Sequence, residues 1–340
     1  ASGTFECRPE HALNGNARGV VIANDFAVFI SDPERAGELP RRAALLQRDP
    51  AARTTPEWNA ATGAMGKVAP ADRKHFAAME EAVEKGYLSH TRCIERGKEY
   101  GMWNYADTHT YWDVARDSAQ LHRVWHNSHY HEMGKTWLMY YRTGSPDLLR
   151  WARPSTDHWM NVDTINYADP KAPIKFHTPG AQYHCKGLTH WGAEATGMTR
   201  RDGHAGLSGH WVDPDAFLWC WYLDGNPRAR EVYQLWADSF LSRGLPTRGT
   251  RREANTTLAV IMTWYQATWN PNLLPAIHAM GRSLRLDEPL EKQFPGPMWH
   301  PLWITRYYEQ TRDPEYVPFI LKYARLSQLG DTWTTALGAL

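Results

Sequence analysis

The pattern of apolar and polar positions is β-like only near the start of the chain and helical over most of the rest. Two β-type runs, Gly19–Ala23 and Phe26–Ile30, are separated by Asn24-Asp25, a spacing typical of a hairpin or of the end of a β domain. Prolines then punctuate a loop-rich passage between residues 33 and 56. We therefore expect a β-hairpin and loop-rich segment over 1–60, followed by a helical catalytic domain over 61–340.

Three helices are expected in the following part of the chain. One spans about residues 71–87, bounded by Pro70 at its start and Gly86 near its end. A short helix covers 91–99. A third runs over 113–141 and opens on an aspartate suited to capping the first N–H groups of a helix.

A sequence motif made of an aromatic helix end, a short turn and a proline recurs along the chain. Proline suits the first position of the second helix, because the N–H that it lacks would have no partner within the helix. The last three copies are spaced as in repeats of helix pairs, and an insertion separates the first copy from the second. The copies are Tyr140–Pro146, Trp221–Pro227, Trp264–Pro271 and Tyr307–Pro314.

Repeated helix pairs form either an open solenoid or a closed α/α toroid. An insertion between repeats suits a toroid whose cleft lies at one rim. The fold class expected is therefore mainly α, an α/α toroid with a short β segment at the N-terminus, and a solenoid is the alternative.

Composition narrows the classes of function. The 38 basic and 37 acidic residues nearly cancel, so charge indicates neither nucleic acid nor a membrane surface as a partner. No apolar run approaches the length that spans a membrane. The 17 Trp and 16 Tyr exceed ordinary core needs, and such rings often line carbohydrate clefts, although most of them pack helix against helix.

The cysteines do not indicate a metal site. Cys7, Cys93, Cys185 and Cys220 lie far apart and form no CxxC pair, so a cysteine-based zinc site is not expected. One disulfide is possible without an assignable pairing. Cys220 stands between two tryptophans and is expected to be a buried free thiol.

One stretch, His177–Trp211, carries the densest set of chemical groups. It has little helical or strand periodicity, and long unpatterned segments of this kind are usually functional or disordered. Its richness in His, Trp and Tyr argues against disorder. We interpret it as an active-site loop between helices, and its candidate residues are Tyr183, His184, Arg200, Arg201, His204, His210 and Trp211.

The end of this stretch is the best defined part. Asp213 suits an N-cap and Pro214 a first helical residue, so His210 is expected just outside a helix N-terminus, where an anion is favoured. Arg200 and Arg201 can bind a carboxylate or sulfate through paired hydrogen bonds, or can be a solvated basic pair.

The spacing of histidines elsewhere in the chain gives only a weak indication of a metal site. His122 and His126 have helical zinc spacing but lack the glutamate of the zincin motif. His129 and His131 form a His-x-His pair, whose members point to different sides of a helix. We expect no cofactor, with a divalent metal bound by the histidine cluster as the alternative.

A family resemblance follows from several short motifs of the chain. Residues 100–240 resemble the central α/α domain of the exo-rhamnogalacturonan lyase-like family (the PcRGLX/YetA-like group) and, more broadly, the α/α-toroid polysaccharide lyases. The chain departs from that family where acidic residues are expected, since positions 129 and 131 are both histidine. The motifs are Trp125-x-Asn127-x-x-Tyr130, Tyr141–Gly144, Val162-Asp163-Thr164, Gly203-His204 and His210-x-Val212-x-Pro214.

The resemblance implies β-elimination on a uronic-acid glycan, with a set of Asn, His, Tyr and Arg side chains at the site. Such a reaction needs the substrate carboxylate neutralised and a base and an acid beside it. The catalytic residues implied are Asn127, His131, Tyr183, His184, His204 and His210, and the substrate-binding residues are Trp125, Tyr130, Arg200, Arg201 and Trp211.

Two other functions stay open from the sequence. A glycoside hydrolase on the same scaffold would use paired carboxylates, with Asp163, Asp213 and Asp215 as candidates. A non-catalytic helical-repeat protein would bind carbohydrate through Trp and Tyr faces. The expected partner is an acidic polysaccharide or oligosaccharide. The start at Ala1 suits a processed chain, and the substrate suits a secreted or periplasmic protein.

Overall fold

The structure is a computed structural model and is mainly helical. It describes residues 28–48, 53–66, 68–98, 108–113, 118–126, 132–164, 166–167, 214–242, 251–283, 300–318 and 320–321. The expected β runs before residue 28 lie outside these ranges, and residues 28–30, at the end of the second run, are not in a strand.

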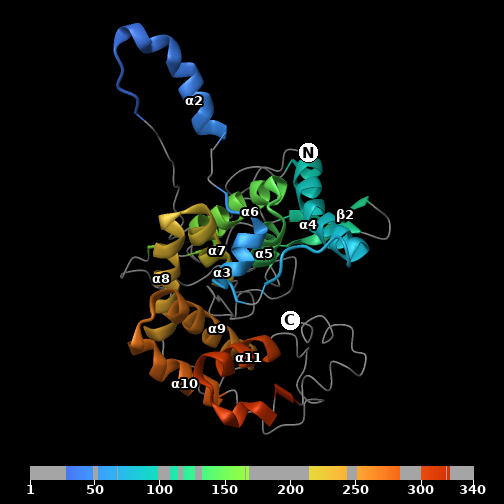
Figure 1. The fold of residues 1–340 in the computed structure, drawn as a ribbon, viewed down its shortest axis with the longest axis vertical. Helices are drawn as coiled ribbons and strands as arrows, with labels where there is room; N and C mark the ends of the chain where they lie inside the picture. The colour runs from blue at the N-terminus through green and yellow to red at the C-terminus, as the bar shows by residue number, and fades with distance from the viewer. Residues whose placement is uncertain are drawn as a thin grey trace, which may run out of the picture.

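The passage from residue 33 to 56, expected to be rich in loops, contains helices instead. A 3₁₀ helix, η1 (Pro33–Glu38), continues into α2 (Leu39–Arg48), and α2 stands away from the other helices (Figure 1). The helix α3 (Pro56–Thr62) follows, capped at its start by the Thr55 hydroxyl. Prolines open both helical stretches, where their missing N–H is harmless, so they start helices here rather than interrupt them.

The next helix differs from the prediction at both ends. The helix α4 runs from Ala77 to Gly97, so it starts later than expected and absorbs the separate helix predicted over 91–99. The residues before it form a turn, in which the Asp72 carboxylate accepts hydrogen bonds from the N–H groups of Lys74 and His75. Gly86 lies inside α4, where a glycine costs only about 1 kcal/mol and does not end a helix by itself.

The first half of the helix predicted over 113–141 is wrong. The strands β1 (Thr108–Asp113) and β2 (Ser118–His126) form an antiparallel hairpin, with Asp113 opposite Ser118 and Thr110 opposite Leu121. The register shifts between Thr108 and Thr110. The β-branched and aromatic residues of β1 favour a strand, and β2 supplies the partner for its backbone hydrogen bonds. The hairpin packs on α4.

The helical hairpins predicted from the recurring motif are confirmed at all four copies. Each first helix ends, two residues pass, and a proline opens the next helical element. Their bounds are α5 (Glu132–Thr143) with α6 (Pro146–His158), α7 (Pro214–Asp224) with α8 (Pro227–Ser242), α9 (Arg251–Thr268) with η4 (Pro271–Leu273) and α10 (Leu274–Ser283), and α11 (His300–Thr311) with η6 (Pro314–Tyr316).

The turns share one local geometry. In each, the residue two places before the proline has a positive φ and donates its N–H to the carbonyl four residues back, at 2.7 to 3.0 Å. This left-handed ending satisfies a carbonyl that the helix leaves without a partner. Asn270 and Asp313 then cap the helical turn that follows. The four left-handed residues are Gly144, Gly225, Trp269 and Arg312.

The hairpins stack in two layers. The helices α5, α7, α9 and α11 pack side by side in one row, while α6, α8 and α10 each pack on the row helix before them. In Figure 1 the chain passes along this arrangement from green α5 and α6 through yellow α7 and α8 to orange and red α9, α10 and α11. We call α5, α7, α9 and α11 the row helices.

Aromatic side chains fill the space between the layers. Phe217 of α7 lies edge-on to Trp236 of α8 at 4.4 Å between ring centroids, and Trp236 contacts Trp159 at 5.9 Å. Tyr233 stacks on Trp264 of α9 at 5.1 Å and donates its hydroxyl to a carbonyl of that helix. Tryptophan therefore acts here as helix-to-helix packing. Cys220 is a buried free thiol in the same core, as predicted.

No helix in the described ranges combines the length and apolar character needed to cross a membrane.

Candidate functional site

The two ends of the stacked hairpins differ. At one end lie the tight turns that hold Gly144, Gly225, Trp269 and Arg312. At the opposite end the row helices begin and α6, α8 and α10 finish, so every longer connection between hairpins joins the helices there. We call this the loop-bearing end. The segment from residue 165 to 213, which includes the histidine-rich stretch, connects two described helical elements at this end.

Nearly all site residues predicted from the sequence lie outside the described residues. Trp125 belongs to β2, and the structure gives only its backbone. The structure therefore neither joins nor separates the predicted groups. Those outside the described ranges are Asn127, Tyr130, His131, Tyr183, His184, Arg200, Arg201, His204, His210 and Trp211.

The helical zinc spacing of His122 and His126 does not hold, because both residues belong to β2. Four residues along a strand span about 13 Å, whereas one helical turn would bring the two residues together. Within the ranges that the structure describes, no group of three or more His, Cys, Asp or Glu residues is arranged to hold a metal ion.

The loop-bearing end contains a π-helical turn, η3 (Trp159–Asp163), which follows α6 directly. Such turns are rare and frequently occur at functional sites. The Thr164 hydroxyl donates to the Trp159 carbonyl at 2.8 Å and accepts from the Trp236 indole at 3.1 Å, which fixes the turn against α8.

Two polar atoms of this turn are buried without a hydrogen-bond partner among the described residues. They are the indole Nε1 of Trp159 and the side-chain oxygen of Asn161, and the Asn161 side chain belongs to a residue only 7% exposed. A buried polar atom of this kind calls for a water or a ligand group. Sequence reasoning passed over Asn161, although it directly precedes the Val162-Asp163-Thr164 motif used for the resemblance.

An ion pair links two row helices near the same end. Arg306 of α11 donates from Nη1 to both carboxylate oxygens of Asp215, each at 3.2 Å. Asp215 lies in the first turn of α7, where a negative charge is favoured by the helix dipole. In the row α9 lies between α7 and α11, so the bridge joins two helices that are not neighbours in it. Neither the sequence pattern nor the spacing of residues indicates this pair.

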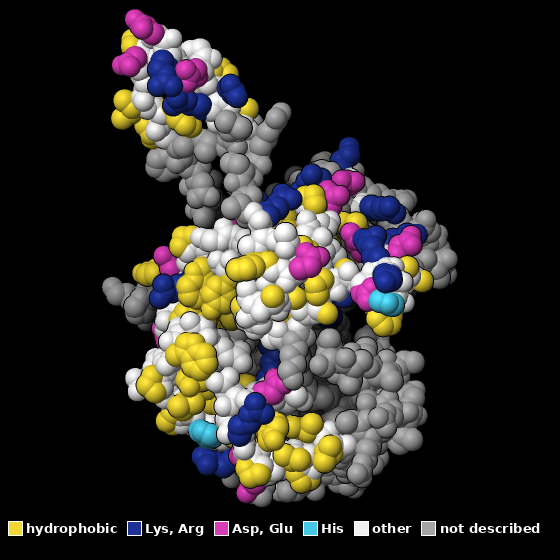
Figure 2. Space-filling model, viewed as in Figure 1, with side chains coloured by type: hydrophobic (Ala, Val, Ile, Leu, Met, Phe, Trp, Pro, Cys, Tyr) yellow, Lys and Arg dark blue, Asp and Glu magenta, His cyan; other side chains and the backbone are white. Residues whose placement is uncertain are grey.

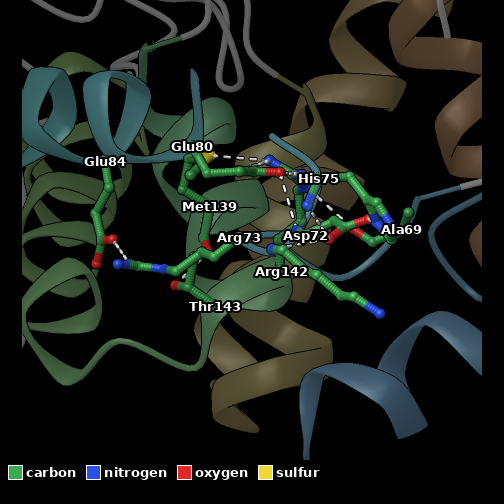
Figure 3. Close-up of polar contacts among 10 residues, drawn as sticks. Ala69, Asp72, Arg73, His75, Glu80, Glu84, Met139, Arg142 and Thr143 are labelled. Atoms are coloured by element: carbon green, nitrogen blue, oxygen red, sulfur yellow. Dashed lines mark hydrogen bonds and ion pairs between the residues drawn. The ribbon is translucent and has the colours of Figure 1, made fainter. Parts of the chain in front are cut away.

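A second polar cluster lies near the first tight turn and is structural (Figure 3). The Glu80 carboxylate is 3% exposed and accepts two hydrogen bonds from Arg142, one of them at 3.1 Å from Nη1 to Oε2. Arg142 also donates from Nε to the Ala69 carbonyl at 3.0 Å, and Glu80 accepts the Asp72 N–H at 3.2 Å. These bonds fasten α5 to α4 and to the turn before it.

The edge of the same cluster is exposed and contains a titratable pair. The His75 Nδ1 atom lies 2.7 Å from Oδ2 of Asp72. The hydrogen bond from His75 lowers the pKa of the Asp72 carboxyl below its ordinary value, with help from the backbone N–H groups of the turn. Figure 3 shows His75 and Asp72 on the turn beside the Glu80 and Arg142 pair.

A chain of titratable groups joins α10, α11 and η6. The Tyr307 hydroxyl lies 3.2 Å from Nδ1 of His278 and 3.3 Å from Oδ2 of Asp313. Burial and the negative charge of Asp313 raise the pKa of Tyr307, so the phenol stays neutral. A phenol with a raised pKa gives up its proton less readily, and we interpret this chain of groups as packing.

Comparisons with protein-family models, with curated proteins and with solved structures return no match for this chain.

Proposed function

We propose that the chain is the helical domain of a polysaccharide lyase and that its stacked hairpins form part of an α/α toroid. The support for the toroid is the two-layer order of the helices together with the Arg306–Asp215 bridge, which indicates that the row curves. The alternation of row helices with a second layer is common to a toroid and an open solenoid, and the bridge favours the toroid in this proposal.

One observation carries the functional part of the proposal. The tight turns occupy one end of the hairpins, and the histidine-rich segment connects to α6 and α7 at the other end. Loops that emerge together at one end of a rigid scaffold are where binding and catalytic residues concentrate. In the proposal, the segment supplies its His, Tyr and Arg side chains to a site near the N-terminus of α7, where backbone N–H groups favour an anionic substrate.

The chemistry follows from the residue types. β-Elimination removes the proton at C5 of a uronic acid, which becomes acidic only when the neighbouring carboxylate is neutralised. In the proposal, Asn127 and His131 neutralise the carboxylate by hydrogen bonding, and Arg201 binds a neighbouring acidic group. His210, or Tyr183 with His184, takes the proton and protonates the leaving glycosidic oxygen.

The remaining candidate residues have supporting roles in the proposal. His204 completes the set of candidate proton-transfer groups, Arg200 adds to the anion site, and the rings of Trp125, Tyr130 and Trp211 bind the sugar faces. A glycan of this kind is met outside the cytoplasm, so the proposal includes export to the periplasm or the medium.

The experiment is an ultraviolet absorbance assay on a panel of uronic-acid polysaccharides, with and without a chelator. A lyase product carries a C4–C5 double bond that absorbs, whereas a hydrolase makes new reducing ends without absorbance. We expect absorbance to rise with one member of the panel. The rate of this rise should be at least about 100-fold lower for His210→Ala, a typical effect of losing a proton-transfer group. Loss on chelation would assign a metal to the histidine cluster.

Variants separate the roles from general damage. Tyr183→Phe and Asn127→Ala test the acid and the carboxylate neutraliser. His75→Ala is a matched control, because His75 is an exposed histidine outside the segment. New reducing ends without absorbance would reject the lyase and favour the carboxylates, of which Asp163 and Asp213 come first because Asp215 is already paired with Arg306. A chain that binds glycans without either product would be a binding protein.

A further inference from the structure

The tight-turn end displays aromatic side chains on its surface. Tyr222 is 45% exposed and Trp269 is 68% exposed, and they come from the ends of neighbouring row helices, α7 and α9. Tyr265 lies beside Trp269, with 5.7 Å between ring centroids, and Tyr222 stacks on Trp221 at 4.9 Å. On the face shown in Figure 2, hydrophobic side chains gather over α7 and α8 and again near α9 and α10.

The third and fourth turns lie next to each other. Gln266 of α9 donates its side-chain amide to Gln310 of α11 at 3.2 Å, which places the third and fourth turns in contact. Tyr222 occupies in α7 the position, five residues before the turn proline, that Gln266 occupies in α9. The helix α7 packs against α9, so Tyr222 lies on the next helix of the row. We call Tyr222, Tyr265, Gln266, Trp269 and Gln310 the turn surface.

Trp269 occupies a backbone position that disfavours it. Its φ is +53°, in the left-handed region, as is that of Arg312 in the fourth turn at +56°, whereas Gly144 and Gly225 occupy the equivalent positions of the first two turns. Side chains with a Cβ are strained in that region, and strained residues persist mainly where the side chain has a use. Trp269 is 68% exposed, so most of it is available for contact with a ligand.

The chemistry of the turn surface fits a sugar rather than an ion. The guanidinium groups beside it already lie over rings, with Arg230 5.0 Å from the Trp221 centroid and Arg312 5.7 Å from the Tyr308 centroid. The side chains that define the turn surface are themselves uncharged, three aromatic rings and two amides. Ring faces pack on the C–H faces of a pyranose, and amides hydrogen-bond to its hydroxyl groups.

We propose that the turn surface is a second glycan-binding site, which takes neutral pyranose units of a polysaccharide at the end of the hairpins opposite the reaction. It extends the proposed function and shares with it only the premise that the ligand is a glycan. The Trp269 ring is the main platform, with Tyr222 as the next ring along the row and Gln266 and Gln310 as hydrogen-bonding groups. Binding there would hold the chain on a polymer while cleavage proceeds elsewhere.

The test is affinity electrophoresis of the whole chain in native gels that contain xylan, galactan, glucomannan or polygalacturonate. The decisive variant is Trp269→Gly, because glycine accepts the left-handed conformation and the turn keeps its geometry. We expect at least one neutral polysaccharide to retard the wild-type chain, and Trp269→Gly and Tyr222→Ala each to weaken that binding about two- to tenfold. Phe76→Ala is the matched control, since Phe76 is an exposed ring, 54% exposed, outside the turns.

The outcomes are separable from those of the lyase assay. Equal retardation of wild type and Trp269→Gly, or no retardation by any neutral polysaccharide, would overturn the proposal. Self-association of the wild-type chain that Trp269→Gly abolishes would assign the surface to a second copy instead. Product formation from a short soluble oligosaccharide is expected to be unchanged in Trp269→Gly, so failure of the lyase proposal and failure of this one give different results.

Discussion

Gly281 determines how closely α10 and α11 approach, and its replacement by alanine tests the packing of the last hairpin. A Cβ at position 281 would lie 2.5 Å from Cζ and 3.0 Å from Oη of Tyr307, and closer still to Cε2. These distances are far inside van der Waals contact. Tyr307 is fully buried, lies 4.7 Å from the Tyr316 ring and is hydrogen-bonded on both sides, so the ring cannot turn away.

The expected magnitude comes from two opposing effects. Alanine in a helix interior is favoured over glycine by about 1 kcal/mol. Forcing an extra methyl group into a tightly packed core costs about 1–3 kcal/mol, and these distances place Gly281→Ala toward the upper end. We expect the free energy of unfolding to fall by about 1–2 kcal/mol, measured as a lower urea midpoint at constant slope.

Gly86→Ala provides the matched control. Gly86 also lies inside a helix, but a Cβ there would meet nothing within 4 Å, so the change should stabilise the chain by about 0.5–1 kcal/mol. In a Tyr307→Leu background, Gly281→Ala should lose its penalty, because the ring that it strikes is gone. If Gly281→Ala proved as stable as Gly86→Ala in the wild-type background, the packing of α10 on α11 described here would be wrong.

Three further changes probe other parts of the fold. Glu80→Gln leaves Arg142 without its carboxylate and should lower the free energy of unfolding by about 3 kcal/mol in urea titrations; a loss under about 1 kcal/mol would mean that the pair is not fastening α5 to α4. Gly225→Ala should cost about 1 kcal/mol from backbone strain alone, since φ is +69° and the site is open, and an unchanged thermal midpoint would argue against that conformation. The hydrogen bond from His75 lowers the pKa of Asp72, so it contributes stability at pH values above the ordinary pKa of 3.8, and this contribution is lost as the pH falls through the lowered pKa. His75→Ala should therefore raise the pKa of Asp72 in an NMR titration.

The tight turns could be predicted from sequence because their determinants are local. A helix end, a residue with positive φ, a capping side chain and a proline all lie within a few residues of one another, as in Thr268-Trp269-Asn270-Pro271. The start of α7 at Pro214 was predicted for the same reason.

The β1–β2 hairpin could not be predicted in the same way. Residues four apart share a face on a helix and also on a strand, so the spacing of His122 and His126 fits both periods. The choice between them depends on β1, whose backbone pairs with β2 from outside the segment being read. Local pattern alone favoured the wrong structure there.

The candidate site was only partly accessible to sequence reasoning. Its anchor near Pro214 follows from capping rules, but the Arg306–Asp215 bridge joins residues from separate hairpins that are far apart in the sequence. The buried position of Asn161 depends on η3, a π-helical turn that no local sequence signal specifies. Contacts between distant residues become visible only when the helices are placed in space.

The prolines of the tight turns mark intervals whose lengths can be compared among homologues. The interval from Pro146 to Pro227 is nearly twice that from Pro227 to Pro271 or from Pro271 to Pro314, and the excess falls wholly at the loop-bearing end. Each turn is closed by its own residues, so insertions and deletions at the other end leave the stacking of helices unchanged. Among homologues, the last two intervals should stay nearly constant while the first varies in length, and that variation would record how one scaffold acquires new specificities.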